Sequence, residues 1–203
     1  MTGRIGAPVV LASASAARAQ MLRAAGVALA IDPAAIDEDE VKASLRQSGA
    51  DGAAVAERLA ELKALRIANR HPAALVIGAD QVLQQGAEPY YKPPDLAAAR
   101  RQLLALRGQT HELISAVVIV RDGVRLWHHV GRARLTMRTF TNQFLEQYLT
   151  EAGDEALGSV GAYRLEGRGV QLFQRIEGDY FTILGLPLLP VVDFLREQGA
   201  LPS

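Results

Sequence analysis

The run Ala74-Leu75-Val76-Ile77-Gly78-Ala79-Asp80-Gln81 places a carboxylate directly after a short apolar segment. An apolar segment of this length that contains a glycine is typical of a buried strand in a sheet covered by helices. In open α/β sheets, ligands bind beyond the carboxyl ends of the strands, so we expect Asp80 to lie at the rim of the sheet and to face a cleft. For this stretch alone, a turn or a short hairpin opened by Asp80 explains the pattern equally well.

An anion-binding loop is predicted near the start of the chain. Val9-Val10-Leu11 indicates a first strand, and a helix is expected over 16–25, after a loop of small residues. The N-terminus of a helix presents unpaired N–H groups and a partial positive charge. Ser13, Ser15 and Arg18 beside it predict a compact cradle for phosphate. Capping of the helix by Ser15 is the simpler alternative, but it leaves Ser13 and Arg18 unexplained.

Composition limits the classes of function. A chain of 203 residues that is 49% hydrophobic and 22% charged is long enough for one sizeable core and is too ordinary to be disordered. Lys plus Arg and Asp plus Glu both number 22, so no global basic field is available for a nucleic-acid polymer. The absence of cysteine excludes disulfides, thiolate catalysis and cysteine-ligated zinc.

The sequence predicts a protein of the cytoplasm that does not enter a membrane. The apolar run at 8–11 is about half the length that a signal peptide needs, and the serines that follow it suit phosphate binding better than cleavage. No window approaches the length of a membrane span. Both observations agree with the lack of cysteine, which is typical of a reducing compartment.

The remaining pattern predicts an α/β fold with a mixed, twisted sheet flanked by helices. We expect one domain over 1–203 with two lobes, the smaller of which, around residues 85–150, closes over a cleft. A strand is expected at 27–31, and the acidic run Asp37-Glu38-Asp39-Glu40 is typical of a helix start. A second hairpin is predicted at Glu177-Gly178-Asp179. Helices are further predicted over 51–69, 96–106, 141–151 and 188–198, and strands over 113–120 and 124–137.

Lys92 lies in Tyr91-Lys92-Pro93-Pro94, where two prolines hold the backbone extended. A lysine fixed in this way near the rim of a sheet can bind a phosphate as a point charge, although solubility is the commoner role of an exposed lysine. Lys63 falls on the helix predicted over 51–69. Its local pattern is that of an ordinary solvated lysine.

Taken together, the order and spacing of these segments resemble the Maf family of nucleoside triphosphate pyrophosphatases over nearly the whole chain. No one motif is specific, but their succession is. The segments that carry the resemblance are Leu11-Ala12-Ser13-Ala14-Ser15 with Arg18, Val76-Ile77-Gly78-Ala79-Asp80, Lys92-Pro93, Gly161-Ala162-Tyr163 with Gly167, and Gly185-Leu186-Pro187-Leu188.

The resemblance implies a fold related to the inosine triphosphate pyrophosphatases, a homodimer, and hydrolysis of a nucleoside triphosphate to the monophosphate and pyrophosphate with Mg²⁺ or Mn²⁺. By position, Asp80 matches the proposed catalytic base of the family. Ser13, Arg18, Glu38, Lys63 and Lys92 match the polar set around the triphosphate. We expect Glu38 and Asp80 to supply carboxylate ligands to the metal ion, because oxygen ligands suit these hard cations.

The chain departs from the family pattern at two places. Ala16 and Ala17 replace the Pro-Arg that commonly follows the loop serine, and Ser159 stands where a lysine is common. The replacement of Arg by Ala17 and the replacement of Lys by Ser159 each remove a positive charge near the phosphates.

Three positions separate the subfamilies by substrate, and here they are Ala17, Gln81 and Glu166. Two of the three agree with the 7-methyl-GTP enzymes, and none agrees with the Arg, Thr and Gln of the enzymes that hydrolyse dTTP and UTP. An ionised Glu166 only accepts hydrogen bonds, which favours guanine N1–H and its exocyclic amine. The alternatives are a dTTP/UTP pyrophosphatase and a weakly catalytic, nucleotide-binding regulator of cell division.

Overall fold

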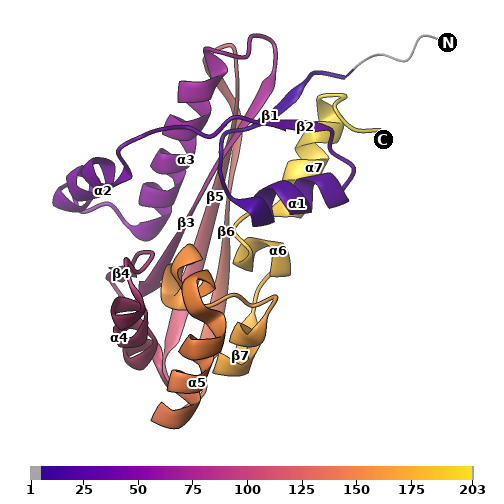
Figure 1. Ribbon diagram of the computed structural model, residues 1–203. Coiled ribbons are helices and arrows are strands. Elements are labelled where there is room, and N and C mark those ends of the chain that lie inside the picture. Colours follow the sequence, from indigo (N-terminus) through magenta and orange to yellow (C-terminus); the bar gives the residue numbers. More distant parts are fainter. Residues whose placement is uncertain (1–5, 203) are drawn as a thin grey trace.

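The computed structural model describes residues 6–202, which form a seven-stranded mixed sheet with helices packed against it (Figure 1). The strand order is β2-β1-β3-β5-β6-β7, and β4 pairs with β3 outside this path. The α/β fold with a mixed sheet is thereby confirmed. The strands are β1 (Val9–Leu11), β2 (Leu29–Ile31), β3 (Leu75–Gln85), β4 (Glu88–Tyr90), β5 (Thr110–Arg121), β6 (Val124–Met137) and β7 (Phe173–Glu177).

The predicted helices form close to their expected bounds, because caps fix their ends. Asp51 and Asp95, for example, accept a hydrogen bond from the backbone N–H three residues on, which starts a helix at the following residue. The helices are α1 (Ala16–Ala24), α2 (Glu38–Gln47), α3 (Gly52–Ala68), α4 (Leu96–Leu106), α5 (Asn142–Ala152), α6 (Tyr180–Ile183) and α7 (Leu188–Glu197), with 3₁₀ turns η1 (Gly153–Gly158), η2 (Val160–Ala162) and η3 (Arg168–Leu172).

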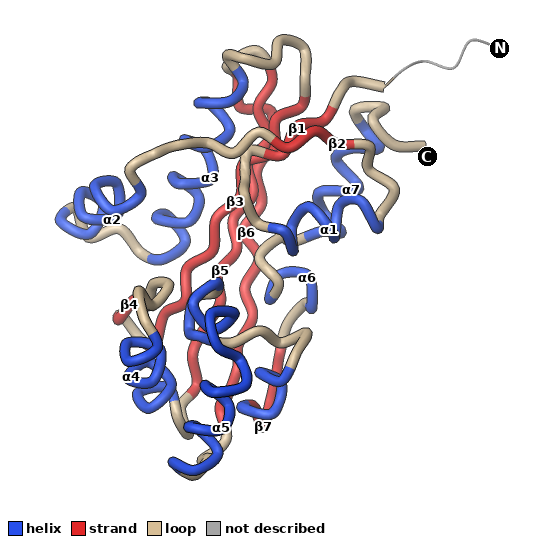
Figure 2. The backbone as a smooth tube through the Cα atoms, viewed as in Figure 1, coloured by secondary structure: helices blue, strands red, loops and turns tan. Residues whose placement is uncertain are grey.

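The long strands β3, β5 and β6 run through the whole molecule, and different helices cover their two halves (Figures 1 and 2). In the upper half, α3 covers one face of the sheet, and α1 and α7 cover the other. In the lower half, α4, α5 and the 3₁₀ turns cover the α7 side. On the opposite face of that half, Glu112 pairs with Arg132 and Arg134, which is typical of a solvated surface.

β3 shares one of its edges between two short strands. β1 runs parallel to its first part and ends with Leu11 opposite Ile77. β4 pairs antiparallel with its last part, beginning with Leu83 opposite Tyr90. β5 takes nearly the whole of the other edge. Residues 78–82 of β3 therefore have no strand partner on the β1 side, and the fold has a gap there.

Gly78 lets α3 lie directly on β3. A Cβ at this position would fall far inside contact distance of the Ala60 carbonyl oxygen and 2.8 Å from the Ala64 nitrogen. Both atoms belong to the backbone of α3, so neither can swing aside. The close approach brings Lys63 of α3 over Asp80, two residues beyond the glycine on the same face of β3.

One predicted hairpin is wrong. Residues 180–183 form the short helix α6, not a strand, because Asp179 caps it and accepts hydrogen bonds from the Thr182 backbone N–H and hydroxyl. The preceding strand, β7, pairs with β6 instead. Among the helices of residues 6–202, none is both long and apolar enough to cross a membrane.

Candidate active site

Asp80 lies in the middle of β3, opposite Ala116 of β5, and not at the carboxyl end of its strand. The expectation that Asp80 lies at the rim of the sheet is therefore wrong, since β3 continues to Gln85. The strand that does end is the neighbour, β1, and its loop occupies the gap beside residues 78–82. Asp80 faces a candidate site because β1 stops beside it. Ligands bind beyond the carboxyl ends of parallel strands, and the strand that ends here is β1.

Lys63 joins the two predicted carboxylates. Its Nζ lies 2.6 Å from Asp80 Oδ1 and 2.7 Å from Glu38 Oε1. The side chains of Lys63 and Asp80 are only 10% and 9% exposed, so this pair is well shielded from water. Asp80 Oδ2 accepts no hydrogen bond from the described residues, which leaves it available to a water molecule or a cation.

Glu38 is held ionised by two lysines. Burial raises the pKa of its carboxyl, but the hydrogen bonds and charges of Lys63 and Lys42 outweigh this effect and lower the pKa to about 2. Lys42 Nζ lies 3.0 Å from Glu38 Oε2, one turn further along α2. Glu38 therefore contributes a full negative charge at neutral pH.

Arg18 lies beneath the loop and ties three segments together. Its Nε donates to the Gly185 carbonyl at 2.7 Å, and its Nη1 donates to the Ala79 carbonyl at 2.8 Å and to Ser13 Oγ at 3.2 Å. Burial lowers the pKa of the guanidinium, and the charges of Asp80 and Glu38 counteract this shift. No described residue accepts from Nη2, which remains the part of Arg18 that can bind an anion.

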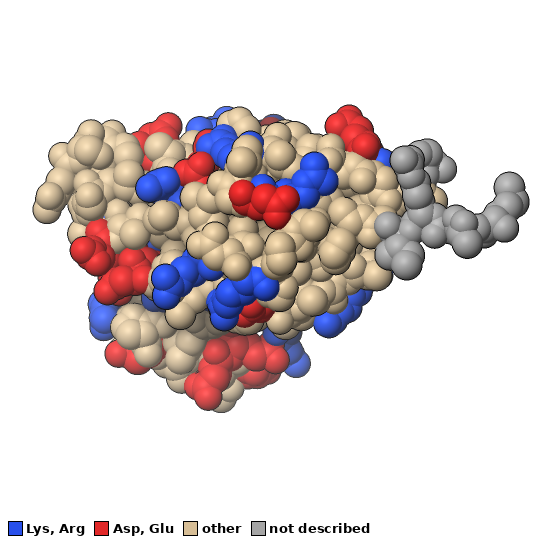
Figure 3. Space-filling model, turned by 90° about the horizontal axis from the view of Figure 1, so that it is seen from above, with Lys and Arg blue, Asp and Glu red and all other residues tan. Residues whose placement is uncertain are grey.

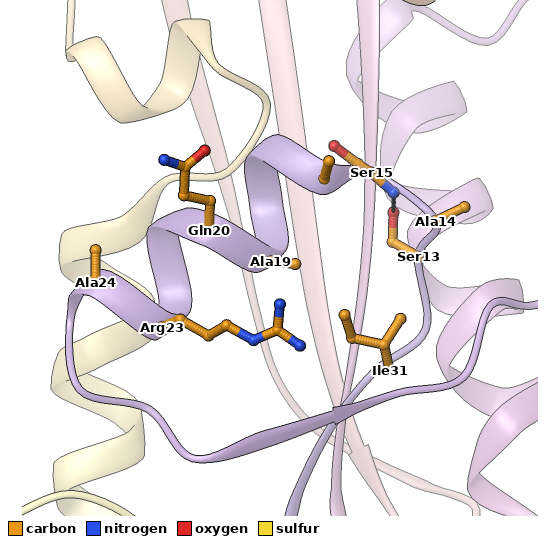
Figure 4. A pocket seen from close by; sticks show the side chains of 9 residues that line it. Ser13, Ala14, Ser15, Ala19, Gln20, Arg23, Ala24 and Ile31 are labelled. Carbon is orange, nitrogen blue, oxygen red and sulfur yellow. Dashed lines mark hydrogen bonds between the residues drawn. The ribbon is translucent and has the colours of Figure 1, made fainter.

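The two loop serines surround the N-terminus of α1. Ser15 caps the helix, accepting from the Arg18 backbone N–H at 3.4 Å, and Ser13 Oγ accepts from the Ser15 backbone N–H at 3.3 Å. The cap by Ser15 is thus present, and the role of Ser13, Ser15 and Arg18 in binding phosphate stays a prediction. Both serines also line a hollow of about 710 Å³ between α1 and β2, into which Arg23 extends toward Ile31 (Figure 4).

The cluster brings together charges of both signs in equal number. Arg18, Lys63 and Lys42 lie among Asp80, Glu38 and Asp39, and Asp39 Oδ1 is 3.9 Å from Lys42 Nζ. Elsewhere, the face of the molecule seen from above shows Lys and Arg interspersed with Asp and Glu, without a continuous basic field (Figure 3).

The predicted specificity residues lie on other faces. Gln81 points away from Asp80, because neighbours on a strand alternate, and its Nε2 donates to Ser115 Oγ, the Thr182 carbonyl and the Ile183 carbonyl at 3.0–3.1 Å. Only its Oε1 remains for a ligand. Glu166 pairs with Arg164 at 3.0 Å. Ala17 is half-buried on α1, and Lys92 is exposed in the loop between β4 and α4.

The segment Gly161–Tyr163 has a constrained backbone. Gly161 and Ala162 both have positive φ, at 81° and 62°, which is unusual for alanine. Three side chains hold the turn: Tyr148 Oη donates to the Ala162 carbonyl at 3.0 Å, Ser159 Oγ donates to the Tyr163 carbonyl, and His111 Nε2 lies 2.7 Å from Tyr163 Oη.

His111 makes this segment sensitive to acid. Burial lowers its pKa from 6.5 to about 4, and Nδ1 has no partner among the described residues. Since the folded state disfavours protonation, its contribution to stability is complete above pH 6.5 and is lost as the pH falls to about 4. We expect a loss of about 3 kcal/mol over this range that the double variant His111→Phe, Tyr163→Phe does not show.

Urea unfolding at pH 7 and pH 4 measures this difference. Tyr163 is replaced together with His111, because a single replacement leaves the buried hydroxyl unpaired. Equal acid losses in the parent and the double variant would contradict the assignment.

The family profile described as Maf-like protein matches residues 8–198. The chain belongs to the Maf family. Among curated Maf relatives, it is 58% identical over 192 residues to a protein of Paramagnetospirillum magneticum named nucleoside triphosphate pyrophosphatase, covering 95% of this chain and 99% of that one. It is 51% identical over 193 residues to a Rhizobium etli protein named 7-methyl-GTP pyrophosphatase, covering 95% and 97%.

A solved structure, that of a HAM1 protein from Coxiella burnetii, is similar to this Maf protein with a TM-score of 0.41 and 13% identity, over 66% of this chain and 74% of that one.

The structure adds three residues to the predicted Maf site: Lys42 beside Glu38, Arg23 in the hollow, and Tyr91 beside Lys92. Glu38 and Lys42 stand four apart, which from sequence reads as an ordinary surface pair on a helix. No local signal distinguishes Arg23 or Tyr91. Their positions follow from how α1, α2 and the loop after β4 pack.

Proposed function

We propose that this Maf protein hydrolyses a nucleoside triphosphate to the monophosphate and pyrophosphate. The observation that carries the proposal is the position of Asp80, which Lys63 holds beside an anion-binding loop and the carboxylate of Glu38. With Oδ1 fixed by Lys63, Oδ2 orients a water molecule or takes its proton while the water attacks the α phosphorus. The bond to the pyrophosphate oxygen then breaks, and pyrophosphate leaves.

The triphosphate binds across the gap beside β3. Ser13, Ser15 and the first N–H groups of α1 provide donors at one end. Arg18 Nη2 adds a charged donor, and Lys92 adds a point charge from the opposite loop. These groups place the negative charge of the phosphates near Asp80, while Lys63 offsets part of the repulsion between that carboxylate and the substrate.

A divalent cation, Mg²⁺ or Mn²⁺, would bind at Asp80, whose Oδ2 is a hard oxygen that no described residue occupies. Both oxygens of Glu38 are paired with Lys63 and Lys42, so Glu38 would join the cation only by giving up a lysine, and no cluster of three or more Asp, Glu, His or Cys residues that could hold a metal exists within 6–202. Two carboxylates completed by water and phosphate oxygens are the usual surroundings of Mg²⁺ in nucleotide enzymes. When bound, the cation would offset negative charge on the phosphate oxygens.

The nucleobase of the bound substrate reaches the other face of β3. Residues 78–82 lack a strand partner on the β1 side, where Arg18 Nη1 binds the Ala79 carbonyl, and we propose that a ligand seated beside Arg18 at this edge contacts Asp80 on the α3 face and Gln81 on the α6 face. Gln81 Oε1 and the Glu166 carboxylate then provide acceptors only. Acceptors suit the N1–H and exocyclic amine of guanine, and a negative carboxylate also attracts a 7-methylated, cationic ring.

The change Glu166→Gln is expected to shift this preference. In the parent, we expect 7-methyl-GTP and GTP to exceed UTP and dTTP in kcat/KM by about 10- to 100-fold, since an acceptor that the bound nucleotide covers and leaves unmatched costs roughly 1–3 kcal/mol. The variant narrows that ratio, because a neutral amide can donate to a pyrimidine carbonyl. A parent that prefers UTP or dTTP, with the same preference in Glu166→Gln, contradicts the proposed recognition of guanine and leaves the pyrophosphatase proposal intact.

The proposal itself is tested by turnover of a panel of normal and modified triphosphates at fixed Mg²⁺, with phosphate detected after addition of an inorganic pyrophosphatase. Signal that depends on the added pyrophosphatase supports it. Tight nucleotide binding without release would instead favour a binding regulator of cell division. We further propose that the enzyme is a cytoplasmic homodimer and does not bind a nucleic-acid polymer, in line with its balanced charge.

A further inference from the structure

Tyr91 connects the loop that carries Lys92 to helix α2. It precedes Lys92 in the loop between β4 and α4, and its ring lies against two cations of α2. Lys42 Nζ lies 4.9 Å from the ring centroid and the Arg46 guanidinium 4.7 Å from it. Arg46 Nε also donates to Tyr91 Oη at 2.9 Å. The loop and the helix are thus joined by one aromatic side chain.

α2 depends on such contacts because it has little core of its own. None of its residues is buried, and Val41 and Leu45 only partly cover the core of α3. The attachments of α2 that involve charge are the Glu38–Lys63 ion pair at one end and the contacts with Tyr91 further along. A helix with few buried apolar side chains is expected to open readily when one attachment is removed.

The contacts form a continuous path across the site. Asp80 binds Lys63, Lys63 binds Glu38, and Glu38 binds Lys42, which lies over the Tyr91 ring. On the loop side, Gln102 of α4 donates to the Tyr91 carbonyl at 2.8 Å, so the backbone beside Lys92 is fixed as well.

We propose that Tyr91 is a positioning residue that holds α2 and the Lys92 loop together, so that Glu38 and Lys92 act on the same triphosphate. This inference rests on the proposed function and adds a residue to it. Tyr91 has no contact with the reacting atoms and acts through Glu38 at one end and Lys92 at the other.

Three variants separate this role from general stability. Tyr91→Leu removes both the ring and the hydroxyl, Tyr91→Phe keeps the ring under the two cations, and Tyr180→Leu replaces a half-exposed tyrosine on α6 as a control. Two measurements are made on each: hydrogen exchange of the amides of residues 38–47 in the absence of nucleotide, and kcat/KM for 7-methyl-GTP and GTP.

Tyr91→Leu should accelerate exchange across α2 and lower kcat/KM by about tenfold, from the loss of two cation–π contacts and one charge-assisted hydrogen bond. Tyr91→Phe should keep most of the protection of α2 from exchange and most of kcat/KM, and Tyr180→Leu should change neither quantity. In a Lys92→Ala background, Tyr91→Leu should have a smaller effect, because part of its action is already lost.

Unchanged exchange in α2, or unchanged kcat/KM in Tyr91→Leu, would overturn the inference. A Tyr91→Leu effect that is equally large in the Lys92→Ala background would overturn the coupling to Lys92. If the parent hydrolyses no triphosphate, the proposed function fails, while the exchange measurement still decides whether Tyr91 holds α2.

Discussion

Asp80→Asn is expected to fold like the parent and to lose about 10²- to 10⁴-fold in kcat, the usual effect of removing a general base. The fold should survive because Lys63, the buried partner of Asp80, keeps its ion pair with Glu38 at 2.7 Å. An amide at position 80 still accepts the hydrogen bond from Lys63 but cannot take a proton from water.

The matched control is Asp193→Asn, which makes the same chemical change at an exposed ion pair on α7. It should retain the activity of the parent. Thermal unfolding of both variants shows whether the fold is kept. If Asp80→Asn turned over triphosphates as fast as Asp193→Asn, Asp80 would not be the base.

Gly78→Ala is expected to damage both the fold and the site. The added methyl group meets the backbone of α3 at Ala60 and Ala64, so the helix must move away from β3. Overpacking of this kind costs about 1–3 kcal/mol, or a fall in Tm of roughly 2–12 °C for a chain of this size. Moving α3 also lengthens the 2.6 Å contact between Lys63 and Asp80, so kcat should fall with stability.

Gly158→Ala is the control for this change, because a Cβ at Gly158 would have no neighbour within 4 Å. Calorimetry and turnover of the two variants are compared at one temperature below both transitions. A Gly78→Ala protein as stable and active as Gly158→Ala would show that the close approach of α3 does not build the site.

Local sequence signals determined most elements of this fold. The helix predicted over 96–106 has those bounds in the structure, since Asp95 caps it and Gly108 follows it with positive φ. The turn at Asp122-Gly123 joins β5 to β6 as predicted, with both residues at positive φ. Capping and turn formation depend on neighbours in sequence, so the sequence reveals them.

The errors occurred where a distant partner decides the structure. Residues 180–183 have β-forming side chains, but the cap by Asp179 and the packing of α6 against β5 and β6 make them helical. The position of Asp80 depends on where β1 ends, and the Asp80 segment alone does not carry that information.

The site residues divide in the same way. The Ser13–Ser15 loop could be predicted from its strand, small residues and helix, since these are adjacent in the chain. Lys63 could be named only by resemblance, because its partners lie 17 and 25 positions away on other elements. Neither a local sequence pattern nor the resemblance to the family pointed to Tyr91. Only the packing of α2 against the loop identifies it.

The central claim is that water attacks the α phosphorus of a nucleoside triphosphate at Asp80. The decisive measurement is hydrolysis of GTP and 7-methyl-GTP in ¹⁸O-labelled water. The products are separated, and mass spectrometry shows which of them carries the ¹⁸O label. We expect equal amounts of monophosphate and pyrophosphate, with the label in the monophosphate, and nearly none of either from Asp80→Asn. Diphosphate with free phosphate, or label in the pyrophosphate, would contradict it.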